Sequence, residues 1–346
     1  MKSVFYLTIL MVLLVHERGR GQDIHLSHIH ASPTFLNPAM TALINEDIRL
    51  IANYRSQWQS FTKGYQTFVA SADGKAYHGL GRGDEFGVGI QLMADQAGDL
   101  KYQSFDGAIS LSYLKALNRE GDHIISLGMR HGIIQNKIDL ADLKLFEQDP
   151  GIFNENFDNN IINYDLSGGA AWFVPFGRGE SFHLGVSMFH INRAFYSFTG
   201  DKNYQEGQFL QPRYVFHFGG SYNLGWFTTL KPSVILMNQG PHREINGGTF
   251  LKITKEARTY LRPLYSLYAG AWLRWTYNDG RFQSDAVVGS VRYDYRNTVY
   301  TFSFDINISN LARASSGFGG PELSIIKYFE FDRPTRQRSR LKCPAF

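Results

Sequence analysis

The sequence predicts an all-β protein, a transmembrane antiparallel β-barrel of about fourteen strands, and three observations support this class. Apolar and polar residues alternate with a period of two in many segments, most clearly over 298–308, where Tyr300, Phe302 and Ile306 alternate with small or polar residues. Aromatic residues make up 15% of the chain and charged residues 19%, against roughly 25% charged residues in soluble proteins. The third observation is an N-terminal export signal.

Residues 1–21 have the organisation of a secretory signal peptide. A basic residue precedes the apolar residues 3–15, and Gly19 and Gly21 provide small residues before the expected cleavage site. The apolar run is too short to span a bilayer as a helix, and no later run approaches eighteen residues. We therefore expect Gln22 to begin the mature chain, and strands to cross the membrane.

Runs of about ten residues, bounded by turn-forming residues, mark fourteen candidate strands. They are expected to begin near residues 47, 65, 85, 104, 122, 162, 181, 212, 228, 246, 266, 283, 297 and 320. The count is even, as in bacterial single-chain barrels. Alternation alone would also suit a soluble β-sandwich, but the export signal and the aromatic residues at strand ends favour a barrel with two membrane interfaces.

The lengths of the connections suit this barrel if both termini lie in the periplasm. Long stretches at 138–161, 192–211 and 309–319 then face outside, and most of the intervening turns are short, as is typical of outer-membrane barrels. The expected division is a signal peptide at 1–21, an N-terminal periplasmic segment at 22–46, the barrel at 47–330 and a basic C-terminal periplasmic tail at 331–346.

Five arginines fall on the expected lumen side of their strands: Arg49, Arg55, Arg130, Arg274 and Arg292. One interpretation is that they pair with lumen carboxylates and fill the barrel. The other is a basic interior that contacts an extended peptide or loop. The first arrangement is the more common one in such barrels, so we expect it here.

Several short motifs resemble those of the PorP/SprF family. Near the N-terminus these are Asn37-Pro38-Ala39 and Tyr54-Arg55-Ser56-Gln57-Trp58. Further along come Gly185-Val186-Ser187 with His190, Gly270-Ala271-Trp272-Leu273-Arg274, the most specific block Phe304-Asp305-Ile306-Asn307-Ile308-Ser309-Asn310-Leu311, and the ending Leu341-Lys342-Cys343-Pro344-Ala345-Phe346. The resemblance covers nearly the whole mature chain.

This resemblance implies an outer-membrane component linked to type IX secretion and gliding motility in Bacteroidota. It would be either a partner of the core export apparatus or an accessory that helps to export or hold a surface adhesin. The implied partners are other type IX secretion proteins, including peptidoglycan-associated or motor-associated periplasmic components, and a secreted surface protein, with outer-membrane lipid around the barrel. The small net charge of +4 makes nucleic acid an unattractive partner.

The motifs also supply candidate contact residues for these partners. They are Asn37, Pro38, Tyr54, Arg55, Trp58, Trp272, Arg274, Asp305, Asn307 and Ser309. A structural role competes at several of them, because aromatic residues also form interfacial girdles, and lumen arginines also form ion pairs. Asn37-Pro38 predicts a periplasmic or plug-like turn rather than a ligand site.

The tail carries a run of basic residues that would point into the periplasm and could dock a partner there. The candidate docking residues are Arg336, Arg338, Arg340, Lys342 and Cys343, although most such runs are only solvated. Cys343 is the single thiol, so it either stays free or forms an intermolecular disulfide. His25, His28 and His30 lie close in sequence without an acidic or Cys partner, so we expect no metal there.

No enzyme signature stands out: the chain has no Gly-x-Ser-x-Gly elbow, His-Glu-x-x-His pair or phosphate loop. We therefore expect a binding protein without a cofactor. Two other classes remain open. A passive outer-membrane channel for small or apolar solutes would have an open lumen, and a rim-sited lipid hydrolase would use Ser, His and Asp residues scattered in the sequence.

Overall fold

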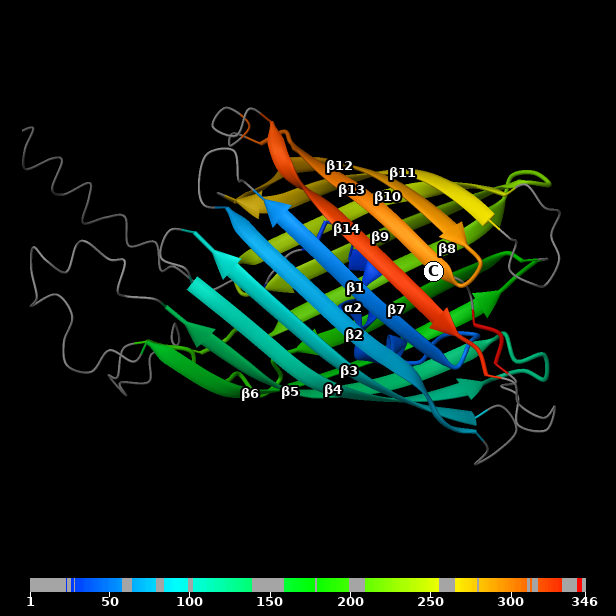
Figure 1. Ribbon diagram of the computed structural model, residues 1–346, viewed down its shortest axis with the longest axis horizontal. Coiled ribbons are helices and arrows are strands. Elements are labelled where there is room, and N and C mark those ends of the chain that lie inside the picture. Colours follow the sequence, from blue (N-terminus) through cyan, green and yellow to red (C-terminus); the bar gives the residue numbers. More distant parts are fainter. Residues whose placement is uncertain are drawn as a thin grey trace, which may run out of the picture.

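A computed structural model gives the fold. It describes residues 23, 26–27, 29–57, 64–78, 84–98, 102–138, 159–177, 179–198, 209–254, 265–278, 280–309, 312, 317–331 and 341–343. These residues form one closed antiparallel barrel in which each strand pairs with its sequence neighbours and β14 pairs with β1 (Figure 1). The fourteen-strand barrel predicted from the sequence is therefore confirmed.

The strands begin close to the predicted positions. Their bounds are β1 (Ile48–Gln57), β2 (Tyr65–His78), β3 (Asp84–Ala97), β4 (Tyr102–Ala116), β5 (Ile124–Lys137), β6 (Asn160–Pro175), β7 (Ser181–Phe189), β8 (Arg213–Asn223), β9 (Thr228–Gln239), β10 (His242–Thr254), β11 (Tyr265–Asn278), β12 (Arg281–Tyr295), β13 (Thr298–Asn307) and β14 (Phe318–Phe329). The largest difference is at β10, which was expected at 246 and begins at His242. Within the described residues, no helix is long and apolar enough to span a membrane.

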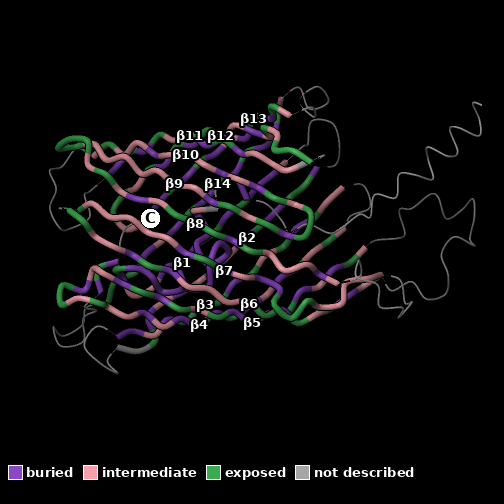
Figure 2. The backbone as a smooth tube through the Cα atoms, turned by 180° about the vertical axis from the view of Figure 1, so that it is seen from behind, coloured by how far each residue is buried: buried purple, intermediate pink, exposed green. Residues whose placement is uncertain are grey.

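The barrel wall has an apolar outer face and a polar inner face, because successive side chains of a strand point to opposite sides. On β13, Tyr300, Phe302 and Ile306 are exposed on the outside, while Ser303 and Asp305 are buried inside. Figure 2 shows the same alternation of exposed and buried residues along the other strands. An apolar exterior around a polar interior is typical of a barrel that contacts lipid.

The barrel has two distinct mouths. We call the end where β1 begins and β14 ends the terminal mouth, on the right in Figure 1, and the opposite end the loop mouth. Short connections such as 117–123, 176–180 and 224–227 lie at the terminal mouth. The connections 138–159, 190–212 and 308–317 lie at the loop mouth, and they are the long stretches predicted from the sequence.

The N-terminal segment lies inside the barrel instead of on the periplasmic side, where the sequence analysis placed it. We call its described residues within 23–46 the plug. It contains the short helices η1 (Ile29–Ala31), α2 (Pro33–Leu36) and η2 (Pro38–Met40), and nearly every residue from 31 to 44 is buried. A fourteen-strand barrel is too wide for wall side chains alone to fill, so the plug supplies the missing core.

The plug packs closely against the wall. An ideal Cβ on Gly128 would lie 2.4 Å from the backbone of Pro38, so only glycine leaves room for the plug at this point of β5. Apolar plug residues also join wall residues in shared clusters; Leu36 and Met40, for example, pack with Phe189 and Val215. The interior of the barrel is thus a core made of two parts of the same chain.

Candidate functional site

An ion pair fastens the end of the plug near the terminal mouth. Arg49 on β1 donates from Nε and NH2 to Asp73 on β2, at 2.9 and 2.7 Å, and NH2 also donates to the Met40 carbonyl at 3.1 Å. The second oxygen of Asp73 accepts the backbone N–H of Ala42 at 2.7 Å. Because both charged side chains are almost fully buried, this pair fixes the plug to two wall strands.

Asn37 fastens the middle of the plug. Its Nδ2 donates to the backbone carbonyls of Ala170 on β6, at 2.9 Å, and Val186 on β7, at 3.2 Å. Its Oδ1 accepts the N–H of Ala39 and so caps η2, whose first residue is Pro38. The Asn-Pro turn predicted from the sequence is therefore a plug element, with both residues buried inside the barrel.

Three of the motif residues come together from distant strands. Arg55 on β1 and Arg274 on β11 both contact Asp305 on β13, at 3.0 and 3.1 Å, and Arg274 also contacts Asp285 at 2.7 Å. Register shifts occur next to Arg274 and next to Asp305. Such irregularities re-aim side chains, and here they flank the residues that form this ion-pair cluster.

The other motif residues lie apart from that cluster. Trp272 packs edge-on against Phe250, with ring centroids 4.6 Å apart, and its N–H donates to Ser233 Oγ at 3.2 Å. Asn307 donates to the Phe318 carbonyl at 3.4 Å, near Ser309 in the loop mouth. Tyr54 is exposed on the outer face, and Trp58 lies outside the described residues.

All five lumen arginines are paired with aspartates, as the first of the two interpretations predicted. The pairs are Arg49 with Asp73, Arg55 with Asp305, Arg130 with Asp106 and Asp165, Arg274 with Asp285 and Asp305, and Arg292 with Asp294. These side chains therefore fill and neutralise the lumen.

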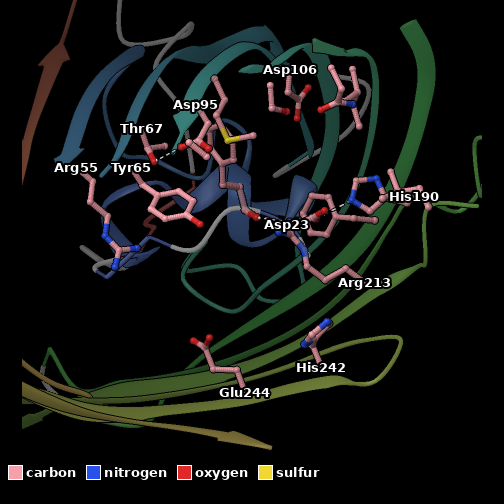
Figure 3. Close-up of a pocket in the computed structure, with 18 of the residues that line it drawn as sticks. Asp23, Arg55, Tyr65, Thr67, Asp95, Asp106, His190, Arg213, His242 and Glu244 are labelled. Carbon is pink, nitrogen blue, oxygen red and sulfur yellow. Dashed lines mark hydrogen bonds and ion pairs between the residues drawn. The ribbon is translucent and has the colours of Figure 1, made fainter. Parts of the chain in front are cut away.

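The first described residue, Asp23, lies in a cradle formed by His190, Arg213 and Gln239. Its carboxylate contacts His190 Nε2 at 2.7 Å and Arg213 NH1 at 3.0 Å. Gln239 donates from Nε2 to the same carboxylate at 3.0 Å and accepts the Asp23 backbone N–H on Oε1, also at 3.0 Å. We call these three residues the Asp23 cradle; Figure 3 shows Asp23 between His190 and Arg213.

His190 joins the plug to the wall. Its Nδ1 contacts Asp165 on β6 at 2.7 Å, while its Nε2 contacts Asp23. Burial alone would lower the pKa of His190, but the carboxylates of Asp23 and Asp165 outweigh it and raise the pKa to about 9. Burial would raise the pKa of Asp23, and the charges of His190 and Arg213 instead lower it. At neutral pH the imidazolium therefore donates to a carboxylate on each side.

A cavity of about 770 Å³ lies between the plug and the loop mouth, in the half of the lumen nearer to that mouth. Asp23 and Phe35 of the plug form part of its lining, together with strand ends at Gln57, Tyr65 and Tyr102 (Figure 3). The segment that follows β7 contributes too, because Tyr196 lines the cavity and its hydroxyl contacts that of Tyr102. The cavity has the size of a ligand pocket, roughly 300–1,000 Å³.

The lining of this cavity combines apolar side chains, such as Met93, Ile134 and Leu210, with charged groups. It includes the carboxylates of Asp95, Asp106 and Glu244 as well as the cations of Arg55 and Arg213. Figure 3 shows these groups around the cavity. Among the described residues, no group of three or more His, Cys, Asp or Glu side chains is arranged to hold a metal ion. Of the three N-terminal histidines, His25 and His28 lie outside the described residues, and His30 contacts Ser233 Oγ at 3.0 Å.

The C-terminal end of the chain is fixed at the terminal mouth. The Cys343 N–H donates to Asn45 Oδ1, and Asn45 Nδ2 donates to the Cys343 carbonyl, both at 2.7 Å. The Lys342 N–H donates to the Gly121 carbonyl at 2.7 Å, and Leu341 is buried. Burial raises the pKa of the Cys343 thiol to about 12, so this thiol is shielded rather than reactive. Arg336, Arg338 and Arg340 lie outside the described residues.

The residues of the cradle were missed by the sequence analysis as a site. His190 was noted only as part of a family motif, and Asp23, Arg213 and Gln239 carry no local pattern of their own. They lie at strand ends and in the plug, and the 216 residues between Asp23 and Gln239 leave no spacing to recognise.

A closed strand barrel with an apolar exterior, a polar lumen and an internal plug defines an outer-membrane β-barrel protein. Residues 19–319 match the family described as "Type IX secretion system membrane protein PorP/SprF". The chain therefore belongs to the PorP/SprF family of type IX secretion membrane proteins.

Of three similar solved structures, the first has the TM-score that supports the fold. The toluene transporter TbuX of Ralstonia pickettii is similar with a TM-score of 0.50 and 11% identity, over 90% of this chain and 96% of that chain. The monoaromatic hydrocarbon channel CymD gives a TM-score of 0.47 and 11% identity, over 91% and 96%. BamA from Haemophilus ducreyi, lacking POTRA domains 1–3, gives 0.45 and 11%, over 82% and 70%. No curated protein sequence matches the chain.

Proposed function

We propose that this protein is a non-enzymatic outer-membrane component of type IX secretion that supports the export or surface attachment of secreted proteins, such as adhesins, through protein–protein contacts. The plug is the observation that carries the proposal. It is fastened to the wall by the Arg49–Asp73 pair, by Asn37 and by the Asp23 cradle. A lumen filled in this way suits a binding protein better than a channel.

The proposed orientation places the terminal mouth in the periplasm and the loop mouth outside the cell. The long connections at the loop mouth and the short turns at the terminal mouth support it. The basic tail then lies on the periplasmic side, where peptidoglycan-associated or motor-associated components of the secretion system would contact it. The cavity lies on the side of the secreted partner.

The fixed position of Leu341–Cys343 changes how tail docking is tested. Residues 332–340 lie outside the described residues, and in the sequence they connect β14 to the anchored Leu341–Cys343. Deleting the whole tail would remove the anchor as well as the charges. Substituting Arg336, Arg338 and Arg340 with Gln removes three charges and keeps Leu341 and Cys343 in place.

The experiment is a pull-down from outer membranes of the intact protein and of this triple Gln variant. Because Asp23 and Cys343 both make contacts that a neighbouring tag would disturb, the affinity tag belongs in the connection between β5 and β6. Recovery of type IX secretion proteins with the intact protein, and their loss with the variant, would support the proposal. A matched variant with Lys substituted at the same three positions controls for charge. If the barrel is recovered alone in every form, the proposal fails.

A passive channel for small or apolar solutes is the second candidate. The cavity favours it by its size and by the apolar side chains in its lining, such as Phe35, Met93 and Leu210, which lie beside the charged groups. Uptake of small sugars by liposomes that contain the purified barrel would distinguish the two. A channel predicts rapid swelling with the intact protein, whereas the plugged barrel predicts swelling only after residues 22–46 are deleted.

A further inference from the structure

The Asp23 cradle has the geometry of a recognition site for an acidic residue. His190 and Arg213 bind the carboxylate, while Gln239 binds both the carboxylate and the backbone N–H of the same residue. Each cradle residue also contacts groups other than Asp23: Arg213 donates to the Phe35 carbonyl in the body of the plug at 3.4 Å, and Gln239 donates to the Gln211 carbonyl at 3.2 Å. His190 contacts Asp165, and the Arg213 guanidinium lies over the Phe189 ring, 4.3 Å from its centroid. A preformed set of donors lowers the entropic cost of binding.

The three cradle residues all lie at the loop-mouth ends of neighbouring strands. His190 directly follows β7, Arg213 begins β8 and Gln239 ends β9. Asp23 borders the cavity, so the space beyond the cradle leads toward the loop mouth. A peptide that enters the cavity from this side can therefore reach the Asp23 carboxylate, which lines the cavity together with Phe35.

The plug is fastened unevenly along its length. From Ser32 to Ile44 its residues are buried, and they are held by Asn37, by the Arg49–Asp73 pair and by wall hydroxyl groups. At its beginning, the described polar fastenings are the cradle and a hydrogen bond from the Ser27 N–H to Glu322 Oε2 at 2.7 Å. Leu26 is also buried in the cluster with Phe35 and Phe189, so the plug is held from Leu26 onward, and Asp23 can leave the cradle while these contacts stay in place.

We propose that the Asp23 cradle is a binding site for an acidic residue in an extended segment of a secreted protein, and that Asp23 is a resident occupant which this segment displaces. Only the secreted source of the segment rests on the proposed function. Asp23 competes with the acidic segment for the cradle. Because Asp23 belongs to the same chain as the cradle, its effective concentration there is of the order given by a short flexible tether, which is in the millimolar range. The intact protein thus binds weak acidic segments poorly and selects those that contact more of the cavity.

The test uses purified barrel in detergent micelles and a fluorescent synthetic peptide that copies residues 22–32 of this chain. Fluorescence anisotropy measures its binding to a variant that lacks residues 22–27, whose cradle is vacant. Binding is expected, and the same peptide with Asn in place of Asp is expected to bind at least about tenfold more weakly, because the charge-assisted contacts are lost. Intact protein should also bind the Asp peptide at least about tenfold more weakly than the truncated variant.

Two further variants keep the test decisive. In the full-length Asp23→Asn variant, residue 23 binds the cradle more weakly although the chain is not shortened. This variant should therefore bind the peptide even if the truncated variant fails to fold. Truncated protein with Arg213→Gln is the matched control, in which the preference for the Asp peptide over the Asn peptide should fall. Equal binding of the two peptides, or no binding to folded protein with a vacated cradle, would overturn the proposal. Because only purified components are used, this result is independent of the pull-down that tests the proposed function.

Discussion

The buried Arg49–Asp73 pair gives a quantitative test of how the plug is held. In Asp73→Asn, Arg49 keeps its buried position and loses its counter-ion, which costs about 3–5 kcal/mol of unfolding free energy. In Asp73→Leu, the backbone N–H of Ala42 also loses its acceptor, which adds about 1–3 kcal/mol. The double variant Arg49→Met/Asp73→Leu contains neither charge, so only the hydrogen bonds to the Ala42 N–H and the Met40 carbonyl are lost.

The expected order of stability is therefore wild type, then the double variant, then Asp73→Asn, with Asp73→Leu the least stable. Urea unfolding in detergent micelles, followed by tryptophan fluorescence, measures these free energies. The reasoning requires the double variant to be more stable than Asp73→Leu alone, which means a strong coupling between the two sites. Losses that simply add, within about 0.5 kcal/mol, would refute it.

Three other predictions test the plug, the cradle and the tail. Gly128→Val forces the plug away from β5 and should cost about 1–3 kcal/mol in the same unfolding assay and open the lumen to ions in planar bilayers, whereas Ser substituted at the exposed Leu127 should do neither. The pKa of His190 in the folded protein is about 9, above its ordinary value of 6.5. The contacts of His190 with Asp23 and Asp165 therefore stabilise the folded protein fully below about pH 6.5, and this stabilisation is lost as the pH rises through 9. The thermal midpoint should fall over that pH range more in wild type than in His190→Gln. Cys343 should react with maleimide at least about tenfold more slowly in folded than in unfolded protein, and equal rates would contradict its burial.

Much of the barrel could be predicted from the sequence because its two faces lie in different environments, and this difference produces a pattern within each short segment. Lipid outside and polar groups inside impose a period of two on every strand, so the count of fourteen and the lumen positions of the arginines followed from short segments. Even the carboxylate partners were anticipated as a class. Which aspartate pairs with which arginine was not, because Arg55 and Asp305 are 250 residues apart in sequence.

The plug could not be predicted in the same way. Its residues have no period, since short 3-10 and α-helical turns packed on every side expose no regular face. Asn37 and Pro38 indicated a turn, and that turn exists, but its position depends on strands β6 and β7 more than 130 residues away. The tail was expected to point away from the barrel, whereas contacts of Leu341 and Cys343 with the terminal mouth hold its end in place.

The contact between Asn45 and Cys343 has a consequence for biogenesis. It joins a residue that precedes the first strand to one that follows the last, across 298 positions, so it can form only after the whole chain has been translated and the barrel has closed. Contacts of such long sequence separation form late in folding. A chain that ends early would leave the Asn45 amide and the apolar surface around Leu43 and Leu114 uncovered at the terminal mouth. Residues 341–343 therefore contribute to the closure of the core at this mouth as well as to the position of Asn45.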